Sequence, residues 1–143
     1  MTSFKKRRII EAVIVFCIGS IMYSLIEVIY RGYTHWTMTL TGGFVFLILY
    51  YMNLTLKTRS FVLRGLLGSL IITLTEFVVG IIVNLRFSMH VWDYSKQPGN
   101  ILGQICPVFS LCWFLLSVPA VYIVIFLHWQ LNKKMNIHQE LES

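Results

Sequence analysis

The sequence predicts an all-α integral membrane protein with four transmembrane helices and a structured outer loop. Three observations predict it: the apolar content, four long apolar runs, and the placement of basic residues. Of the 143 residues, 57% are hydrophobic and 13% are charged, whereas soluble domains are about 45–50% apolar and about 25% charged. A chain this short cannot bury so much apolar surface in one core. A soluble enzyme and a disordered chain are therefore both disfavoured.

Four stretches are long enough to cross a bilayer as helices, which takes about 20 mostly apolar residues. They are residues 9–30, 36–56, 61–85 and 101–129, followed by a tail over 130–143. The first run follows a basic cluster, as the core of a signal peptide does. It is too long for a signal peptide, however, and no small-residue cleavage site follows it. We therefore expect it to be retained, and residues 1–143 to form a single transmembrane domain.

The Lys and Arg residues predict the orientation. Nine of the twelve precede the first span, lie in the link between the second and third spans or just inside the third, or follow the fourth, and these regions share one side of the membrane. They are Lys5, Lys6, Arg7, Arg8, Lys57, Arg59, Arg64, Lys133 and Lys134. Only Arg31, Arg86 and Lys96 fall on the other side. Because positive charge collects in cytoplasmic loops, we predict a multi-pass cell-membrane protein with both termini cytoplasmic. No basic face suited to nucleic acid occurs.

The longest connection, residues 86–103, lies on the predicted outer side. Pro98-Gly99 is a strong turn signal, and Asn100 is placed to cap the fourth helix. Pro107 and Pro119 predict kinks in that helix. A loop without fixed structure would not need large aromatic residues at 92–94, in Trp-Asp-Tyr, close to the turn residues Pro-Gly-Asn at 98–100. We therefore expect an ordered loop that packs over the outer helix ends.

A weak internal repeat relates the two halves of the chain. Gly19-Ser20 with Glu27 aligns with Gly68-Ser69 and Glu76 at an offset of 49 residues. The first and third spans point the same way, so the repeat would be a parallel 2+2 arrangement. So few matches also arise by chance in sequence that is rich in Leu and Ile.

Polar and small residues form inward-facing stripes. In the third span they recur in steps of three or four residues, which places them on one helix face. They are Gly65, Ser69, Thr73, Glu76, Gly80 and Asn84. The fourth span has a similar stripe at Cys106, Ser110, Trp113 and Ser117. Small and hydroxyl residues allow close helix packing, but a carboxylate inside the bilayer is costly and marks a functional site by default.

The predicted ligand site is therefore centred on two glutamates that lie within the spans. Glu27 has Arg31 four residues on, which fits a structural ion pair as well as a function. Glu76 has no opposite charge at that spacing, so it must find a partner on another helix or in the outer loop, or stay protonated. We expect it to face the bundle interior. The predicted ligand-binding residues are Glu27, Glu76, Tyr23, Arg31, His35, Asn84, Trp92, Asp93, Tyr94, Asn100 and Gln104.

No metal site, cofactor or catalytic residue is predicted. The His and Asp residues lack the spacing of a zinc site, and no phosphate-binding Gly-rich loop of a nucleotide hydrolase occurs. Cys17, Cys106 and Cys112 lie in or beside apolar runs. They are interpreted as small packing residues rather than as a disulfide framework.

A set of short motifs extends over residues 23–113. It comprises Tyr23-x3-Glu27, Arg31-Gly32-x2-His35-Trp36, Gly42-Gly43, Glu76 with Gly80 and Asn84, Trp92-Asp93-Tyr94-Ser95, Pro98-x-Asn100, Gly103-Gln104-Ile105-Cys106 and Trp113. This set resembles the small four-span bacterial permeases of the putative ABC-transporter type IV, or CmpB-like, family, with the transmembrane protein 229-like proteins as distant members. The resemblance implies the four-span fold. Its transporter label would also require a separate ATP-binding subunit.

Three functions fit the sequence. The first is a transporter or permease component with an outward-facing polar site around Glu27 and Glu76, gated by the outer loop, for a cationic or proton-coupled ligand. The second is a non-catalytic assembly or regulatory subunit in which the polar stripes serve only packing. The third is a membrane-embedded enzyme for a lipid-like substrate, with Glu76, Asp93 and His35 as acid and base. Because four helices enclose little volume, we also expect a homo-oligomer in the lipid bilayer.

Overall fold

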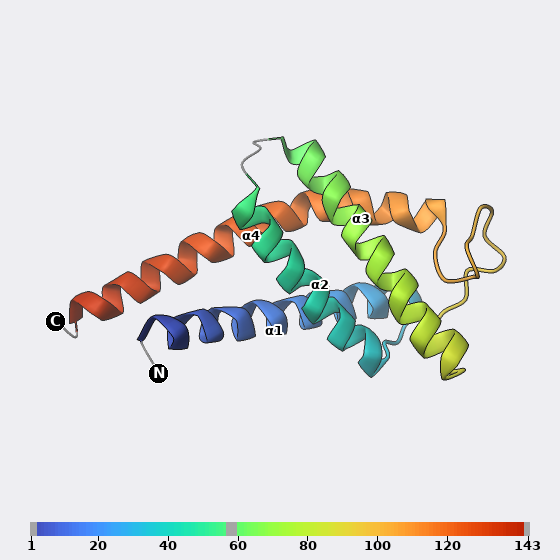
Figure 1. Ribbon diagram of the computed structural model, residues 1–143, viewed down its shortest axis with the longest axis horizontal. Coiled ribbons are helices and arrows are strands. Elements are labelled where there is room, and N and C mark those ends of the chain that lie inside the picture. The colour runs from blue at the N-terminus through green and yellow to red at the C-terminus, as the bar shows by residue number, and fades with distance from the viewer. Residues whose placement is uncertain (1–2, 57–59, 142–143) are drawn as a thin grey trace.

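Four long helices make up most of the computed structural model, which describes the backbone of residues 3–56 and 60–141 and the side chains of residues 8–56 and 60–133 (Figure 1). They are α1 (Ser3–Arg31), α2 (Trp36–Thr55), α3 (Phe61–Gly80) and α4 (Pro107–Leu141). A π-helical segment, η1 (Ile81–Arg86), continues α3. No strand occurs in the described chain, apart from an isolated bridge between Ile101 and Ile105. The predicted all-α fold class is confirmed.

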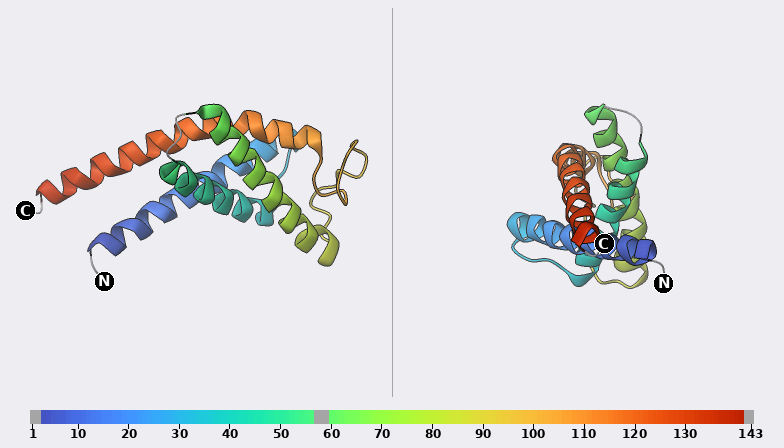
Figure 2. Two further views of the ribbon diagram at one scale, coloured as in Figure 1. Left: turned by 45° about the horizontal axis from the view of Figure 1, so that its top comes forward. Right: turned by 90° about the vertical axis from the view of Figure 1, so that its left-hand side faces the viewer.

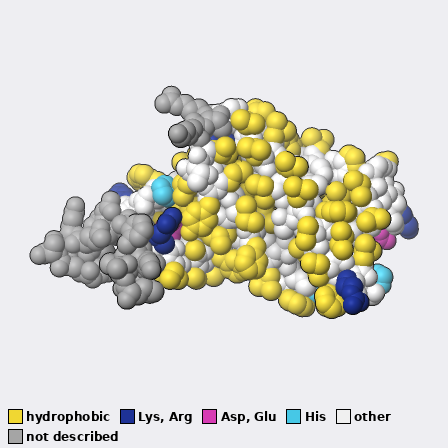
Figure 3. All heavy atoms as spheres, in the orientation of Figure 1, with side chains coloured by type: hydrophobic (Ala, Val, Ile, Leu, Met, Phe, Trp, Pro, Cys, Tyr) yellow, Lys and Arg dark blue, Asp and Glu magenta, His cyan; other side chains and the backbone are white. Residues whose placement is uncertain are grey.

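All four helices are long and apolar enough to span a membrane. The qualifying segments are Arg8–Arg31, Trp36–Thr55, Phe61–Arg86 and Pro107–Lys133. Their outward faces carry large apolar side chains, and hydrophobic side chains are spread across the described part of the face that Figure 3 shows. A water-exposed monomer rarely shows so large an apolar patch, whereas a bilayer covers it at no cost. The chain is a membrane protein with four candidate spans.

Several of the basic residues that predict the orientation have side chains that the structure does not describe. Those of Lys5, Lys6, Arg7, Lys57, Arg59 and Lys134 lie outside the described residues. The two chain ends lie at one end of the molecule and the outer loop, residues 87–106, at the other (Figure 1). This arrangement agrees with a chain that crosses a membrane an even number of times.

The fourth helix begins at Pro107 rather than near residue 101, and the predicted cap at Asn100 is wrong. Proline suits the first position of a helix because its missing N–H has no acceptor there. Asn100 instead braces the outer loop. Its Oδ1 accepts from the Gly103 N–H at 3.0 Å, and its Nδ2 donates to the Gln97 carbonyl at 2.8 Å. Gly103 has a positive φ of 68°, which the turn before α4 requires.

The helices form two hairpins, with α1 packed on α2 and α3 packed on α4. Glycines bring the first pair together: a Cβ on Gly19 would lie 2.3 Å from Phe46 Cβ, and one on Gly42 would lie 2.3 Å from Tyr23 Cβ. Helix α2 also contacts α3 and α4. Helices α1 and α4 run beside one another (Figures 1 and 2) but approach closely at only a few positions.

At the end near the chain termini, a partly buried hydrogen-bond network joins α1, α2 and α4. The Tyr50 hydroxyl donates to Glu11 Oε1 and lies 2.9 Å from His128 Nδ1. Asn132 Nδ2 lies 2.9 Å from His128 Nε2. Because the Tyr50 hydroxyl donates its hydrogen to Glu11, it accepts from His128, whose Nδ1 therefore carries the ring hydrogen. His128 Nε2 then accepts from Asn132 Nδ2. Every ring nitrogen of His128 then has a partner, and the three helices are tied at this end.

Tyr50→Phe tests this network. The change keeps the ring but removes the hydroxyl that bridges Glu11 and His128. A buried polar group left without its partner costs about 1–3 kcal/mol, so we expect a destabilisation of that size in denaturant unfolding of the purified protein in detergent. Tyr122→Phe is the matched control because Tyr122 faces the exterior. Equal stability of the two variants would contradict a stabilising role for the network.

Candidate functional site

A cavity of about 470 Å³ lies at the loop end of the bundle, between α1, α3, α4 and the outer loop. Its volume falls in the range of about 300–1,000 Å³ that is usual for ligand pockets. Both intramembrane glutamates line it. Of the eleven predicted ligand-binding residues, it is lined by Tyr23, Glu27, Arg31, Glu76, Trp92, Asp93 and Tyr94. The intramembrane carboxylates and the outer loop therefore share one cavity.

Glu76 lies inside the bundle with only 3% of its surface exposed. Trp113 on α4 donates its indole N–H to Glu76 Oε2 at 2.7 Å, and the Tyr23 hydroxyl on α1 donates to Oε1 at 3.4 Å. The two aromatic rings stack with their centroids 5.7 Å apart. The partners of this carboxylate are therefore neutral aromatic donors from two other helices, not a cation.

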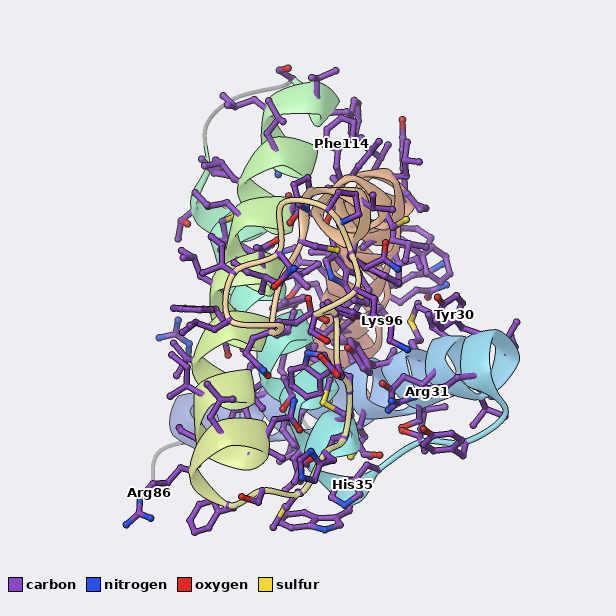
Figure 4. The ribbon with its side chains drawn as sticks, turned by 90° about the vertical axis from the view of Figure 1, so that its right-hand side faces the viewer. Tyr30, Arg31, His35, Arg86, Lys96 and Phe114 are labelled. Carbon is purple, nitrogen blue, oxygen red and sulfur yellow. The ribbon has the colours of Figure 1, made fainter. Side chains whose placement is uncertain are left out.

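Glu27 has more partners than Glu76. Arg31 Nη2 lies 2.8 Å from Glu27 Oε1, and the Thr34 hydroxyl donates to Oε2 at 2.6 Å. Arg31 Nη1 also donates to the Val91 carbonyl at 2.5 Å, and its guanidinium lies over the Tyr33 ring. Figure 4 shows Arg31 on α1 below the outer loop. Glu27 therefore helps to hold the loop on α1 while lining the cavity.

The remaining predicted site residues do not line the cavity. Asn84 and Gln104 are buried and hydrogen-bonded to each other at 2.9 Å, and Asn100 braces the loop. His35 is the N-cap of α2, where its Nδ1 accepts from the Thr37 N–H and lies 2.7 Å from the Thr37 hydroxyl. Its position at the start of α2 is labelled in Figure 4. The structure therefore does not bring His35 into one cavity with Glu76 and Asp93.

Asn84 clamps the outer loop to the end of α3. Its Oδ1 accepts from the Val91 N–H at 2.7 Å, and its Nδ2 donates to the Trp92 carbonyl at 3.0 Å. The Trp92 indole N–H in turn donates to the Gln104 carbonyl at 2.9 Å. Asn84 sits in the π-helical segment η1, a geometry that often occurs at functional sites. The loop is held over the cavity by buried amide groups.

Two loop residues at the cavity have altered acidity. The Ser95 backbone N–H and hydroxyl bond Asp93, at 2.8 and 3.0 Å, and lower the pKa of that carboxyl. Asp93 is therefore ionised at neutral pH. Burial raises the pKa of the Tyr94 phenol above its ordinary value, so Tyr94 stays neutral; its ring stacks on Phe109 at 4.4 Å.

The family follows from a comparison of the whole chain with known protein families. Residues 14–141, which include nearly all of the four helices, match the family described as "Putative ABC-transporter type IV". The chain belongs to this family. The resemblance predicted from the sequence motifs is thus confirmed. Comparison with curated proteins and with solved structures found no match.

Sequence reasoning missed several residues that line the cavity. They include Tyr30, Met38, His90, Gln97, Phe109, Cys112 and Trp113. Trp113 was visible in the polar stripe of the fourth span, and its indole N–H was the signal for a partner. The others carried no comparable signal, because periodicity shows which face of a helix is polar but not which loop residue lies opposite.

Asn84→Ala tests the clamp. The change removes three hydrogen bonds, one of them to the Val91 N–H. Each buried group left unpaired costs about 1–3 kcal/mol, so amide exchange across residues 90–105 should accelerate by roughly tenfold or more. Hydrogen exchange followed by mass spectrometry measures this. Lys96→Ala, an exposed change in the same loop, should leave the rates unchanged; an equal response in both variants would contradict the clamp.

Proposed function

We propose that the protein is a small permease component with an outward-facing polar site around Glu27 and Glu76. The observation that carries the proposal is the cavity that both glutamates line beneath the outer loop. A subunit that serves only packing has no need of a cavity with two intramembrane carboxylates, which are costly in a bilayer. The family assignment to ABC-transporter type IV supports the same function.

The proposed ligand is a cation. Glu27, Glu76 and Asp93 line the cavity, and the one Arg among its lining residues, Arg31, is already paired with Glu27. Phe, Tyr and Trp make up half of the other lining residues, and the faces of their rings attract cations. A cavity lined by several carboxylates with low-dielectric walls concentrates positive ligands. The same carboxylates could carry protons in coupled transport.

Transport would require a movement that opens the bundle at the end opposite the cavity, and a further subunit to drive that movement. The cavity lies at the loop end, whereas Glu11, Tyr50 and His128 tie the opposite end together. A separate ATP-binding subunit at the cytoplasmic end, or a second copy of the chain, would supply the movement that opens it. We therefore retain both a homo-oligomer and an ATP-binding partner as parts of the proposal.

A non-catalytic assembly subunit is the alternative with a specific observation in its favour. Both oxygens of Glu27 are already bonded, to Arg31 and to Thr34. On this alternative Glu27 only positions the outer loop. The enzyme hypothesis has less support because His35, its proposed acid–base partner, lies outside the cavity that holds Glu76 and Asp93.

Glu76→Gln tests the carboxylate site. Gln keeps the size of the side chain and can still accept the Trp113 hydrogen bond, but it carries no charge. We expect tetramethylammonium to bind the variant roughly tenfold more weakly or worse, a difference of about 1.4 kcal/mol. Trp92 and Trp113 line the cavity, so their fluorescence in a Trp36→Phe/Trp129→Phe background reports binding.

Glu11→Gln is the matched control, since Glu11 lies in the network at the opposite end. It should leave tetramethylammonium binding unchanged. If Glu76→Gln binds as tightly as the parent while its expression and oligomeric state are normal, Glu76 is a packing residue and the carboxylate site is refuted.

The proposed orientation is tested by labelling from outside the cell. Lys96 lies in the outer loop and Lys133 near the end of α4, and both are exposed. In a background without the native cysteines, Lys96→Cys should react with an impermeant thiol reagent on intact cells and Lys133→Cys should react only after lysis. The reverse pattern would place the termini and the site on the opposite sides.

A further inference from the structure

A second, apolar cavity adjoins the polar one. It has a volume of about 140 Å³, lies between α1, α2, α3 and α4, and shares four lining residues with the first: Tyr23, Ile26, Trp113 and Leu116. Its other walls are almost wholly apolar. The two cavities are therefore neighbours that share the wall formed by these four residues, with the polar cavity under the outer loop and the apolar one toward the middle of the bundle.

This apolar cavity, hereafter the groove, lies beside the gap between α1 and α4. These helices meet at the loop end, where Tyr30 and Phe109 rings are 5.8 Å apart, and near the opposite end, where His128 lies 3.6 Å from Glu11. Between those points α1 packs mainly on α2 and α4 mainly on α3, although the Tyr23 and Trp113 rings stack across the gap and Val15 and Val124 share one apolar cluster. Leu116 lines both cavities and is 40% exposed on the apolar exterior. The groove thus reaches the surface that a bilayer would cover.

We propose that the ligand is a lipid-like amphiphile with an ammonium head group, which enters sideways between α1 and α4 and lays the first part of its tail in the groove. The inference rests on the proposed cation site and adds the ligand class and the route. The head group would lie among Glu27, Glu76 and the aromatic rings of the polar cavity, and the chain would pass Tyr23 and Trp113 into the groove.

The chemistry of the two cavities selects this occupant. An anionic amphiphile would place its head against carboxylates, and a small cation would leave the groove without a complementary ligand. Quaternary ammonium groups are recognised by aromatic rings, which line the polar cavity. The groove holds no charged residue.

One polar side chain in the wall of the groove lacks a hydrogen-bond partner. Ser117 lines the groove, is 2% exposed, and its hydroxyl is among the buried polar atoms that lack a hydrogen-bond partner in the described chain. Buried hydroxyls nearly always have a partner. Ser117 lies about one helical turn beyond Trp113, on the tail side of the head-group site. The hydroxyl lies against Gly68 on α3, where an added Cβ would come within 2.9 Å of it, so it would turn about χ1 to donate to an ester oxygen near the start of an acyl chain.

The rate at which Cys112 is chemically modified provides a measurement of ligand binding. It lines the polar cavity and is exposed, whereas Cys106 is buried. In a Cys17→Ala protein in nanodiscs of phosphatidylglycerol, which lacks ammonium groups, a bound ligand should slow the modification of Cys112 by N-ethylmaleimide. Dodecyltrimethylammonium should protect at concentrations at least a hundredfold below tetramethylammonium, and dodecyl sulfate should not protect.

Ile123→Trp tests the groove directly because Ile123 lines the groove and not the polar cavity. Filling the groove should raise the protective concentration of dodecyltrimethylammonium at least tenfold and leave that of tetramethylammonium unchanged. Ile125→Trp is the matched control, since Ile125 is 47% exposed and lines neither cavity. Met22→Phe, which narrows the groove from α1, repeats the test if Ile123→Trp does not fold.

The outcomes separate this inference from the cation site. Equal protection by both ammonium probes, or equal effects of the two Trp variants, overturns the groove but leaves the cation site standing. Loss of discrimination against dodecyl sulfate overturns the head-group assignment. Protection by tetramethylammonium that survives Glu76→Gln overturns the proposed function itself. Lysophosphatidylcholine that protects better than dodecyltrimethylammonium identifies a membrane phospholipid as the source, and weaker protection identifies a simple cationic amphiphile.

Discussion

The hydrogen bond from Trp113 to Glu76 is the interaction on which the site depends. It joins α4 to α3 and holds a carboxylate in the interior of a membrane protein, where an unpaired charge is costly. Tyr23 brings α1 to the same carboxylate. Tyr23 and Trp113, which both hydrogen-bond Glu76, also line both cavities. These two side chains therefore mark the boundary between the polar cavity and the apolar one.

The outer loop is held mainly by side-chain amides. Asn84 in η1 satisfies backbone groups of Val91 and Trp92, and Gln104 continues the network from the other end of the loop. Arg31 adds a contact from α1 through the Val91 carbonyl. The loop is thus fixed at both ends over the cavity, and Arg31 connects it to Glu27 in the cavity wall.

The sequence by itself determined the membrane architecture, because its signals are local. Four apolar runs of about 20 residues require four spans, and steps of three and four residues identify the inward faces of the helices. Glu76 on that stripe is buried as expected. The family motifs likewise depend only on residues that are close in the chain. The parallel repeat rests on few matches and stays a prediction.

The tertiary structure alone decided which inward residues meet. Asn84 and Glu76 share one helical stripe, yet Asn84 bonds the loop while Glu76 lines the cavity. Asn100 holds a turn instead of capping α4, because Pro107 begins the helix six residues later than expected. The groove between α1 and α4 arises because each of these helices packs on a different partner. Helical periodicity specifies the face of a helix but not its neighbour, so contacts between distant segments could not be deduced from it.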